Sequence, residues 1–574
     1  MRRRLGLLLC LAALGAVQVH AQEEMSAALK DSGFDRIAVQ TVGLEKSLAT
    51  FARDSLRAIT LRKHIREDDP IALCLHLIAR PGDFADRWLI PVEGDPLMPL
   101  LQQAGTAVDN RTLKLGDCLE FDPRTGAIVG EGKAIGVARH AIMTSEEGSL
   151  SHSAGMRLFT RINAVIDIST GLRIIPDPDD PEGRWYTVEE AEQIGIPGID
   201  EVHHNLHTVL TAVADGDAAA VSTNAARLVN ELRVLPNYAS SKRIGIDHAY
   251  TTRKPFFWAS FAYVLSGVLF FVSLVTHGKR TWFAAMAVMG AGWTVHILGA
   301  AARGYLIGRM PLSSLYEATT TGIAFIILIA LILEGIYRMR IVGCTSAFLS
   351  FIYYRWLLSS EVYGNDAIEP LRAVLNSYWL DYHVTCMMLS YGAFTIAFAM
   401  ALLYLLRAGV PRLMGWSPSL DDLDLYTYRA IQFGWPLLGI GIVLGAVWAD
   451  TAWGRMWSWD PKETWSLITW LIYTVFLHVR LVHGWRGRVM AWASIVGYGA
   501  VLFTYLGVNF VLSGLHSYAG SSPVMAEGLG GAIRNHWMIT LALLAVIVAA
   551  AALLRWMHQR HIANQSSAKA VGQA

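Results

Sequence analysis

The second half of the chain is dominated by apolar segments that are long enough to cross a lipid bilayer. A membrane-spanning helix needs about 20 mainly apolar residues, because each residue adds only about 1.5 Å to a path about 30 Å long. Nine segments meet or approach this length, at residues 256–276, 282–302, 315–336, 341–358, 383–406, 431–449, 465–483, 489–511 and 535–556. The fourth is the shortest. The pattern predicts a polytopic all-α membrane protein with about nine transmembrane helices at 255–560 and a cytoplasmic tail at 561–574.

The first 21 residues are typical of an export signal. Three arginines follow Met1, an apolar run extends over residues 5–17, and the small residue Ala21 marks a plausible cleavage point. A basic region, a short apolar region and a small residue in this order indicate a signal peptide, and an uncleaved signal anchor is the alternative. Both interpretations predict that the segment that follows is exported.

Residues 22–250 contain no apolar run that is long enough to span a bilayer. Strand-like pieces at 71–79 and 161–168 alternate with helical stretches such as 218–235, and the Asp- and Pro-rich stretch at 176–181 predicts an exposed loop. We therefore expect an exported soluble domain of mixed α/β structure. Its cysteines, Cys74 and Cys118, could pair, but two cysteines do not make a disulfide framework.

The charged residues between the apolar segments predict the orientation. If residues 22–250 lie outside, the loops predicted to be cytoplasmic contain Lys279, Arg280, Arg338, Arg340, Arg407, Arg412, Arg480, Arg486, Arg488, Arg555 and Arg560. The opposite loops contain mainly Glu361, Asp366, Glu369, Asp381, Asp460, Glu463 and Glu527. Cytoplasmic loops of membrane proteins carry an excess of Lys and Arg, so this distribution agrees with the export signal. The net charge of +1 gives no indication of a nucleic-acid partner.

A tryptophan-rich segment connects the sixth and seventh apolar segments. Five tryptophans occur between residues 448 and 465, and Pro461 prevents a continuous helix there. An interfacial aromatic belt explains one or two tryptophans at a helix end, but it does not explain this density beside an Asp-Pro-Lys-Glu run. An aromatic surface next to charges suits a large planar ligand with polar edges.

Four histidines occupy positions of interest in or beside the apolar segments. His383 lies at the outer edge of the fifth segment and His516 lies just past the eighth, so both could reach a ligand over the Trp-rich segment. A single interfacial histidine is usually a polar helix end, but imidazole is also a common axial ligand of haem iron. His478 and His296 lie within segments, where an ionisable group serves either helix–helix hydrogen bonding or a second haem site.

The sequence resembles the haem-handling membrane proteins of cytochrome c biogenesis. Their tryptophan-rich "WWD" signature is similar to the run Trp453-Gly454-x-x-Trp457-x-Trp459-Asp460-Pro461-Lys462-Glu463. Residues 311–317, 376–383 and 507–518 further resemble the CcsA/ResC branch of system II. The resemblance covers roughly residues 290–520, in the order that the family has.

The resemblance implies a set of haem-binding residues. Two external histidines of the family ligate haem beside the signature, which corresponds to His383 and His516, and a membrane histidine after it corresponds to His478. The second membrane histidine of the family comes from a ResB-type part that we do not recognise here, and His296 is a substitute candidate. The remaining expected haem contacts are Trp453, Gly454, Trp457, Trp459, Asp460, Pro461 and Trp465.

The implied function is to hold haem b, as a bound substrate, at the outer face of a bacterial inner membrane for covalent attachment to apocytochrome c. The implied partners are the Cys-x-x-Cys-His segment of apocytochrome c, a ResB/CcsB-type membrane protein and a thiol-reducing protein, within a holocytochrome c synthase. One alternative is a haem chaperone or exporter of the CcmC/CcmF type that passes haem to another protein. The other is a secondary transporter for a different solute, which predicts internal repeats that the sequence lacks.

Overall fold

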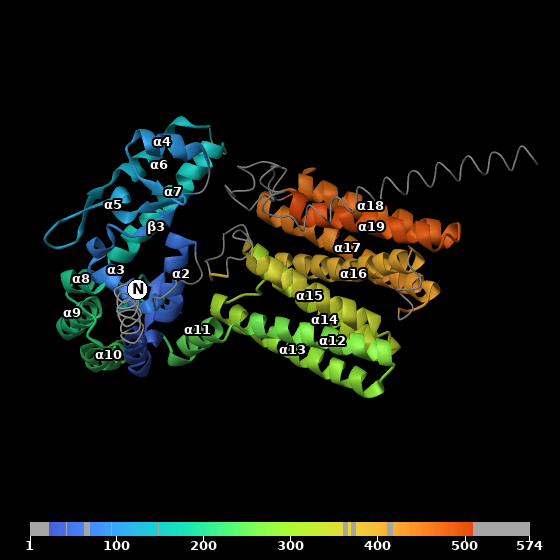
Figure 1. Cartoon of the computed structure of the whole chain (residues 1–574), viewed down its shortest axis with the longest axis horizontal. Coiled ribbons are helices and arrows are strands. Elements are labelled where there is room, and N and C mark those ends of the chain that lie inside the picture. Colours follow the sequence, from blue (N-terminus) through green and yellow to red (C-terminus); the bar gives the residue numbers. More distant parts are fainter. Residues whose placement is uncertain are drawn as a thin grey trace, which may run out of the picture. The chain divides into compact units, whose positions relative to one another are not determined.

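The computed structural model describes residues 22–41, 43–61, 69–92, 95–146, 149–359, 366–368, 375–409 and 417–508. The chain divides into two units, whose main boundary lies between Arg253 and Lys254; residues 367–370 are grouped with the first unit (Figure 1). The predicted signal segment 1–21 and the predicted tail 561–574 lie outside the described residues.

The N-terminal unit contains small antiparallel sheets among many helices. Strand β1 (Ala38–Thr41) pairs with β2 (Leu44–Ser47), and β6 (Leu119–Phe121) pairs with β7 (Ile128–Glu131). A third sheet has the order β3-β5-β4, with β3 at Trp88–Pro91, β5 at Thr112–Lys114 and β4 at Val108–Asp109. The unit is therefore of mixed α/β structure, as predicted, although most of it is helical.

The helices of this unit follow a first helix at 22–31. They are η1 (Phe34–Arg36), α2 (Leu48–Thr60), α3 (Pro70–Ala79), η2 (Pro81–Phe84), η3 (Asp95–Leu97), α4 (Met98–Gln103), α5 (Leu115–Cys118), α6 (Lys133–Thr144), α7 (Leu150–Ser169), α8 (Val188–Gln193), α9 (Ile199–Asp215), α10 (Ala218–Arg233) and α11 (Ser241–Arg253). Helix α10 confirms the helical stretch predicted at 218–235, and the loop predicted at 176–181 is confirmed as irregular and largely exposed.

The two strand-like pieces are wrong predictions, because both are helical. Residues 71–79 lie in α3, where Asp69 Oδ1 accepts hydrogen bonds from the backbone N–H groups of Ile71 (2.9 Å) and Ala72 (3.3 Å). This cap and the proline at the first helical position start a helix. The helix is buried on several sides, so apolar residues occur all around it. The sequence therefore shows a continuous apolar run and not the 3.6-residue spacing of a helix with one buried face. Residues 161–168 lie in the last turns of α7.

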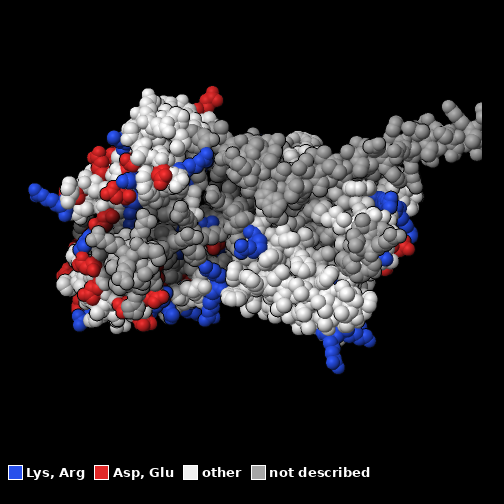
Figure 2. Space-filling model, in the orientation of Figure 1, with Lys and Arg blue, Asp and Glu red and all other residues white. Residues whose placement is uncertain are grey.

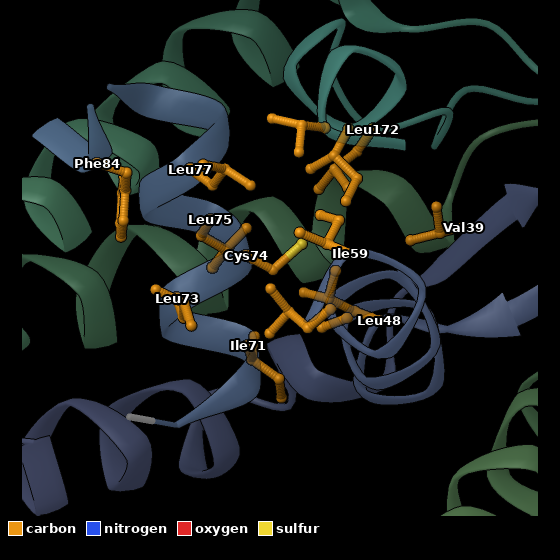
Figure 3. Packing of buried hydrophobic residues seen from close by; sticks show 14 of the residues in the cluster. Val39, Leu48, Ile59, Ile71, Leu73, Cys74, Leu75, Leu77, Phe84 and Leu172 are labelled. Atoms are coloured by element: carbon orange, nitrogen blue, oxygen red, sulfur yellow. The ribbon is translucent and has the colours of Figure 1, made fainter. Parts of the chain in front are cut away.

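The core of the N-terminal unit packs around α3. Figure 3 shows Cys74 pointing toward Ile59 of α2, with Leu48 nearby. Cys74 and Cys118 are both free and buried, so they do not form the disulfide that the sequence allowed. Burial raises the pKa of the Cys74 thiol to about 12, and burial together with the neighbouring Asp117 raises the pKa of Cys118 further. Both thiols therefore stay protonated and act as small apolar groups.

The second unit is a bundle of long helices that run back and forth along one direction (Figure 1). They are α12 (Pro255–Thr276), α13 (Lys279–Ile307), α14 (Leu315–Tyr337), α15 (Ile341–Ser359), α16 (Tyr378–Gly409), α17 (Leu420–Trp453), α18 (Pro461–Val482) and α19 (Arg488–Leu502), which continues into η5 (Phe503–Gly507). Where Figure 2 shows described residues on the flank of this bundle, almost none of them is charged, as contact with lipid requires.

Among the described residues, seven helices are long and apolar enough to cross a membrane, which confirms a polytopic helical membrane protein. Each of the first eight predicted segments coincides with a helix or with part of one. Helix α15, which corresponds to the shortest segment, is not among the seven. The end of the eighth segment and the whole ninth segment, 535–556, lie outside the described residues.

Candidate functional site

The Trp-rich segment (residues 453–465) forms the turn between α17 and α18. Helix α17 ends at Trp453, and Gly454 closes it in the left-handed conformation (φ +69°), with its N–H donating to the Asp450 carbonyl at 2.8 Å. Glycine adopts this conformation without the steric cost that a side chain brings, which is why it is common after a helix end. Pro461 is the first residue of α18, where its missing N–H costs nothing.

Two carboxylates hold the backbone of this turn. The Asp460 side chain accepts a hydrogen bond from the Lys462 N–H (2.9 Å), and Glu463 Oε2 accepts from the N–H groups of Ser458 (2.8 Å) and Asp460 (3.2 Å). Asp460 and Glu463 thus form a capping box at the start of α18. Trp459 adopts φ +58°, an uncommon conformation for a residue with a side chain, and its indole is 69% exposed.

The indoles of the segment meet edge to face. Trp448, only 1% exposed, contacts Trp453 with ring centroids 4.9 Å apart at 62°, and Trp457 contacts Trp459 at 5.7 Å and 88°. This T-shaped arrangement is a favourable aromatic geometry. We call these two pairs, Trp448–Trp453 and Trp457–Trp459, the aromatic wall; Trp448 is buried and Trp459 is exposed. Trp465, in the first turns of α18, packs on Phe503 of η5, with ring centroids 4.3 Å apart.

His383 is placed against this wall from the second turn of α16. Its Nδ1 lies 2.7 Å from the Gly441 carbonyl of α17, and its ring is nearly parallel to the Trp448 indole (12°, centroids 6.3 Å apart). A Cβ atom added to Gly445 would lie 2.7 Å from His383 Cε1. Glycine at 445 therefore makes the close approach of the imidazole to α17 possible.

The contact with Gly441 determines the tautomer of His383. A carbonyl oxygen can only accept, so Nδ1 carries the proton and the lone pair of the neutral ring is on Nε2. A carbonyl partner on one ring nitrogen is the usual way in which proteins orient a metal-ligating histidine and raise the basicity of the other nitrogen. The arrangement fits an axial ligand of haem iron.

Among the described residues, no other predicted histidine lies beside this wall. His516 lies outside them. His478 is exposed near the far end of α18, 13 residues from Trp465 and hence about 20 Å along the helix, and its ring lies 6.2 Å from that of His483. His296 of α13 is 2% exposed, with Nδ1 3.0 Å from Tyr263 Oη and its ring 4.9 Å from that of Phe256.

A buried ion cluster was missed by the sequence analysis. Arg303 Nε donates to Glu317 Oε1 (3.0 Å), Arg309 donates to Glu317 Oε2 (3.2 Å), and Oε2 also accepts from the N–H groups of Ser313 and Ser314. Arg303 and Glu317 are each 2% exposed. The capping-box spacing of Ser314 and Glu317 at the start of α14 was the available signal. The cluster joins α13 to α14 at the bundle end that also carries the Trp-rich segment.

Comparisons with known proteins place this bundle among proteins of cytochrome c biogenesis. Residues 312–516 match a family model described as "Cytochrome C assembly protein". The "Cytochrome c biogenesis protein CcsA" of Chlamydomonas reinhardtii is 39% identical over 223 residues, which are 37% of this chain and 61% of that protein. The CcsA of Guillardia theta is 39% identical over 235 residues and that of Synechococcus elongatus 36% over 261 residues; each match covers 37% of this chain, and 77% and 79% of the relative.

Among solved structures, a chain titled "Cytochrome c Heme Lyase CcmF" aligns with 52% of this chain and 54% of its own length. Its TM-score of 0.35 and its sequence identity of 18% are too low to establish a common fold. The sequence relatives are far more similar, and the match to two of them covers more than three quarters of their length. The chain therefore belongs to the CcsA family of cytochrome c biogenesis proteins.

Proposed function

We propose that this chain holds haem b, as a bound substrate, at the outer face of a bacterial inner membrane and presents it for covalent attachment to apocytochrome c. The similarity to CcsA proteins of cytochrome c biogenesis supports a role in cytochrome c assembly. The observation that carries the proposal is the hydrogen bond between His383 Nδ1 and the Gly441 carbonyl. It directs the lone pair of the ring to Nε2, as an axial ligand of haem iron requires.

In this proposal His383 and His516 fill the two axial positions of the iron. The porphyrin lies against the Trp-rich segment, whose expected contacts are Trp453, Gly454, Trp457, Trp459, Asp460, Pro461 and Trp465. The indoles supply flat apolar surface and exclude water, and Asp460 contributes by capping α18 and holding the segment in shape. Arg303 is not a suitable partner for a haem propionate, because its guanidinium is bonded to Glu317.

A second haem site inside the bundle would use His478 as one ligand, with His296 as a substitute for the membrane histidine that a partner supplies in fused relatives. The exposed imidazole of His478 is accessible to a ligand. His296 is packed between Tyr263 and Phe256, so ligation there requires the three side chains to move apart. The external site is consequently the better supported of the two.

The chemistry at the external site is thioether formation. Each cysteine thiol of the Cys-x-x-Cys-His segment adds across one haem vinyl group, so that an S–C bond forms and the thiol proton goes to the other vinyl carbon. The histidine of that segment replaces His383 or His516 on the iron and brings the thiols beside the vinyl groups. The chain contributes by orienting the haem, and the aromatic wall beside His383 serves this purpose.

The proposed setting is a multi-pass protein whose N-terminal unit and Trp-rich segment face the periplasm. The excess of Lys and Arg in the opposite loops supports this orientation. The expected partners, besides apocytochrome c, are a ResB/CcsB-type membrane protein and a thiol-reducing protein that keeps the apocytochrome cysteines reduced. Together they would form a holocytochrome c synthase, of which this chain is the haem-presenting part.

The test is co-expression with a c-type cytochrome, with and without a ResB-type protein, in a cell that lacks every other maturation system. We expect covalent haem on the cytochrome, read by haem staining after denaturing electrophoresis, and its loss in His383→Ala. The control is His277→Ala, which removes an exposed histidine at the opposite end of α12. Covalent haem that forms equally well without this chain would overturn the proposal. Haem on the purified chain without any thioether product would favour a haem chaperone instead.

A further inference from the structure

A seam of hydroxyl groups runs through the interior of the bundle between α15 and α19. On α15, Ser346, Ser350 and Tyr353 follow each other at spacings of four and three residues, so they lie on one face of the helix. On α19, Ser494 and Tyr498 share a face in the same way. Both helices contact α16 and run in the same direction (Figure 1). The two hydroxyl-bearing faces meet where Tyr353 Oη hydrogen-bonds Tyr498 Oη.

Further hydroxyls continue the seam toward the Trp-rich segment. Thr395 Oγ1 of α16 lies 3.1 Å from Tyr498 Oη. Nearer the end of the bundle, Tyr505 Oη lies 2.9 Å from Thr319 Oγ1. Beside it Thr504 donates to the carbonyl of Trp465 at 3.1 Å. Residues 504 and 505 belong to the π-helical η5, a distortion that is frequent at functional positions.

Several polar groups of this region lack a hydrogen-bond partner within the described part of the chain. They are the side-chain hydroxyls of Ser346, Ser350, Tyr473 and Ser494. All four residues are buried, and three of them have no exposed surface at all. Many threonines of the same bundle donate to the carbonyl four residues earlier, as Thr345 and Thr395 do, but these four hydroxyls do not.

Tyr473 shows how these groups converge on the seam. Its ring stacks on that of Phe394 (centroids 3.8 Å apart), the residue before Thr395. A Cβ atom added to Gly497, the residue before Tyr498, would lie 3.3 Å from Tyr473 Oη. The Tyr473 hydroxyl from α18 therefore lies beside the Tyr498 region of α19.

A buried hydroxyl without a partner is unfavourable, and the bilayer offers nothing to bond with it. Four such groups along one seam require an occupant that both donates and accepts. An apolar ligand cannot do this. Water can, because a buried water typically makes two to four hydrogen bonds to polar groups that are otherwise unsatisfied.

We propose that the seam between α15, α16, α18 and α19 is a binding site for a line of internal water molecules. The line links Ser346, Ser350 and Ser494 to the hydroxyls of Tyr353, Tyr473 and Tyr498. It continues toward Trp465 along the hydroxyls of Tyr505 and Thr504. It makes the middle of the bundle accessible to small hydrophilic molecules. This site does not depend on haem, since the hydroxyls alone form it.

The test is the reactivity of cysteines introduced into the full chain, after its five native cysteines have been replaced, in membrane vesicles. The probe is 2-aminoethyl methanethiosulfonate, a small cation that reacts with thiolates. A thiol forms its thiolate readily beside water and poorly in a dry apolar interior. We expect Ser350→Cys and Ser494→Cys to react about tenfold faster, or more, than a dry control.

The matched control is Ser266→Cys. Ser266 lies midway along α12, has no exposed surface and donates to the Ala285 carbonyl at 2.9 Å, so it is buried without belonging to the seam. If either seam cysteine reacts no faster than this control, the proposal is wrong. Serine and cysteine differ little in size. Should one variant still fail to accumulate, Ser346→Cys takes its place under the same criterion.

Discussion

At the scale of single residues, the Trp-rich segment owes its shape to the two carboxylates that begin α18. Asp460 accepts a hydrogen bond from the Lys462 N–H, and Glu463 accepts from the N–H groups of Ser458 and Asp460. These bonds fix the backbone that carries Trp457 and Trp459. A ligand that rests on the indoles therefore depends on side chains that it does not itself touch.

The change Asp460→Ala tests this dependence. Loss of the cap should lower the free energy of unfolding by about 1 kcal/mol, because the first N–H groups of α18 lose their acceptor. It should also lower the amount of haem retained per protein, because the turn loosens. Thermal unfolding in detergent and haem absorbance measure the two effects. Asp450→Ala, which removes an exposed carboxylate at the end of α17, is the control, and an equal effect of both changes would refute the capping role.

Much of this residue-scale picture could be predicted, and part of it could not. The spacing of Asp460 and Glu463 is a recognisable capping pattern, and His383 was expected beside the tryptophans, where the structure has it stacked on Trp448. The tautomer of His383 depends on a carbonyl 58 residues away, on another helix. Such a contact leaves no mark in the local sequence.

At the scale of elements, apolar composition located the helices of the bundle but underestimated their length. The sixth predicted segment covers residues 431–449, whereas α17 extends over Leu420–Trp453. Its polar first turns are helical because Asp424 forms a bidentate ion pair with Arg480 of α18, with the shorter contact at 2.7 Å. Tertiary packing also explains the wrong prediction at α3. This helix is buried on several sides, so its sequence shows no helical period and indicated a strand.

Helix α11 offers an element-scale test in the N-terminal unit. It docks on η1 through His248, whose Nε2 lies 3.5 Å from the Asp35 carboxylate. Burial raises the pKa of Asp35, and the nearby charges of His248, Arg36 and Lys30 offset this only in part. A raised carboxyl pKa means that the stability contributed by Asp35 is complete below its unfolded pKa and is lost as the pH rises through the folded pKa.

The change Asp35→Asn should therefore increase the protection of α11 against amide hydrogen exchange at pH 7, because no buried charge remains. The gain should vanish as the pH falls toward the ordinary pKa of aspartate. Mass spectrometry of peptides that cover α11, compared with the unchanged protein at each pH, measures it. The control is Asp31→Asn, at an exposed position nearby. Faster exchange in the Asp35→Asn protein at pH 7 would contradict the argument.

At the scale of the whole molecule, the chain is an N-terminal mixed α/β unit joined to a membrane bundle. The connection is a single residue, Lys254, between the end of α11 at Arg253 and the start of α12 at Pro255. Composition alone predicts a division near this point, because the long apolar runs begin there and the charged residues become sparse. The proposed second haem ligand, His516, lies outside the described residues.

The proposed orientation is tested by inserting a phosphatase that is active only outside the cytoplasm into the complete chain. An insertion after Ser458, in the Trp-rich segment, should be active. An insertion after Trp485, between α18 and α19, should be inactive, because one membrane helix separates the two points. The reverse pattern would place His383 on the cytoplasmic side and remove the basis for a periplasmic site.

The central claim is that His383 ligates haem iron beside the Trp-rich segment. Its most direct test is the absorption spectrum of the purified full chain, together with that of His383→Gly and of His277→Ala. We predict the spectrum of bis-histidine haem in the unchanged protein and in His277→Ala, its loss or shift in His383→Gly, and its return when imidazole is added to that variant. A purified protein that retains no haem, or a His383→Gly spectrum identical to that of the unchanged protein, would contradict the claim.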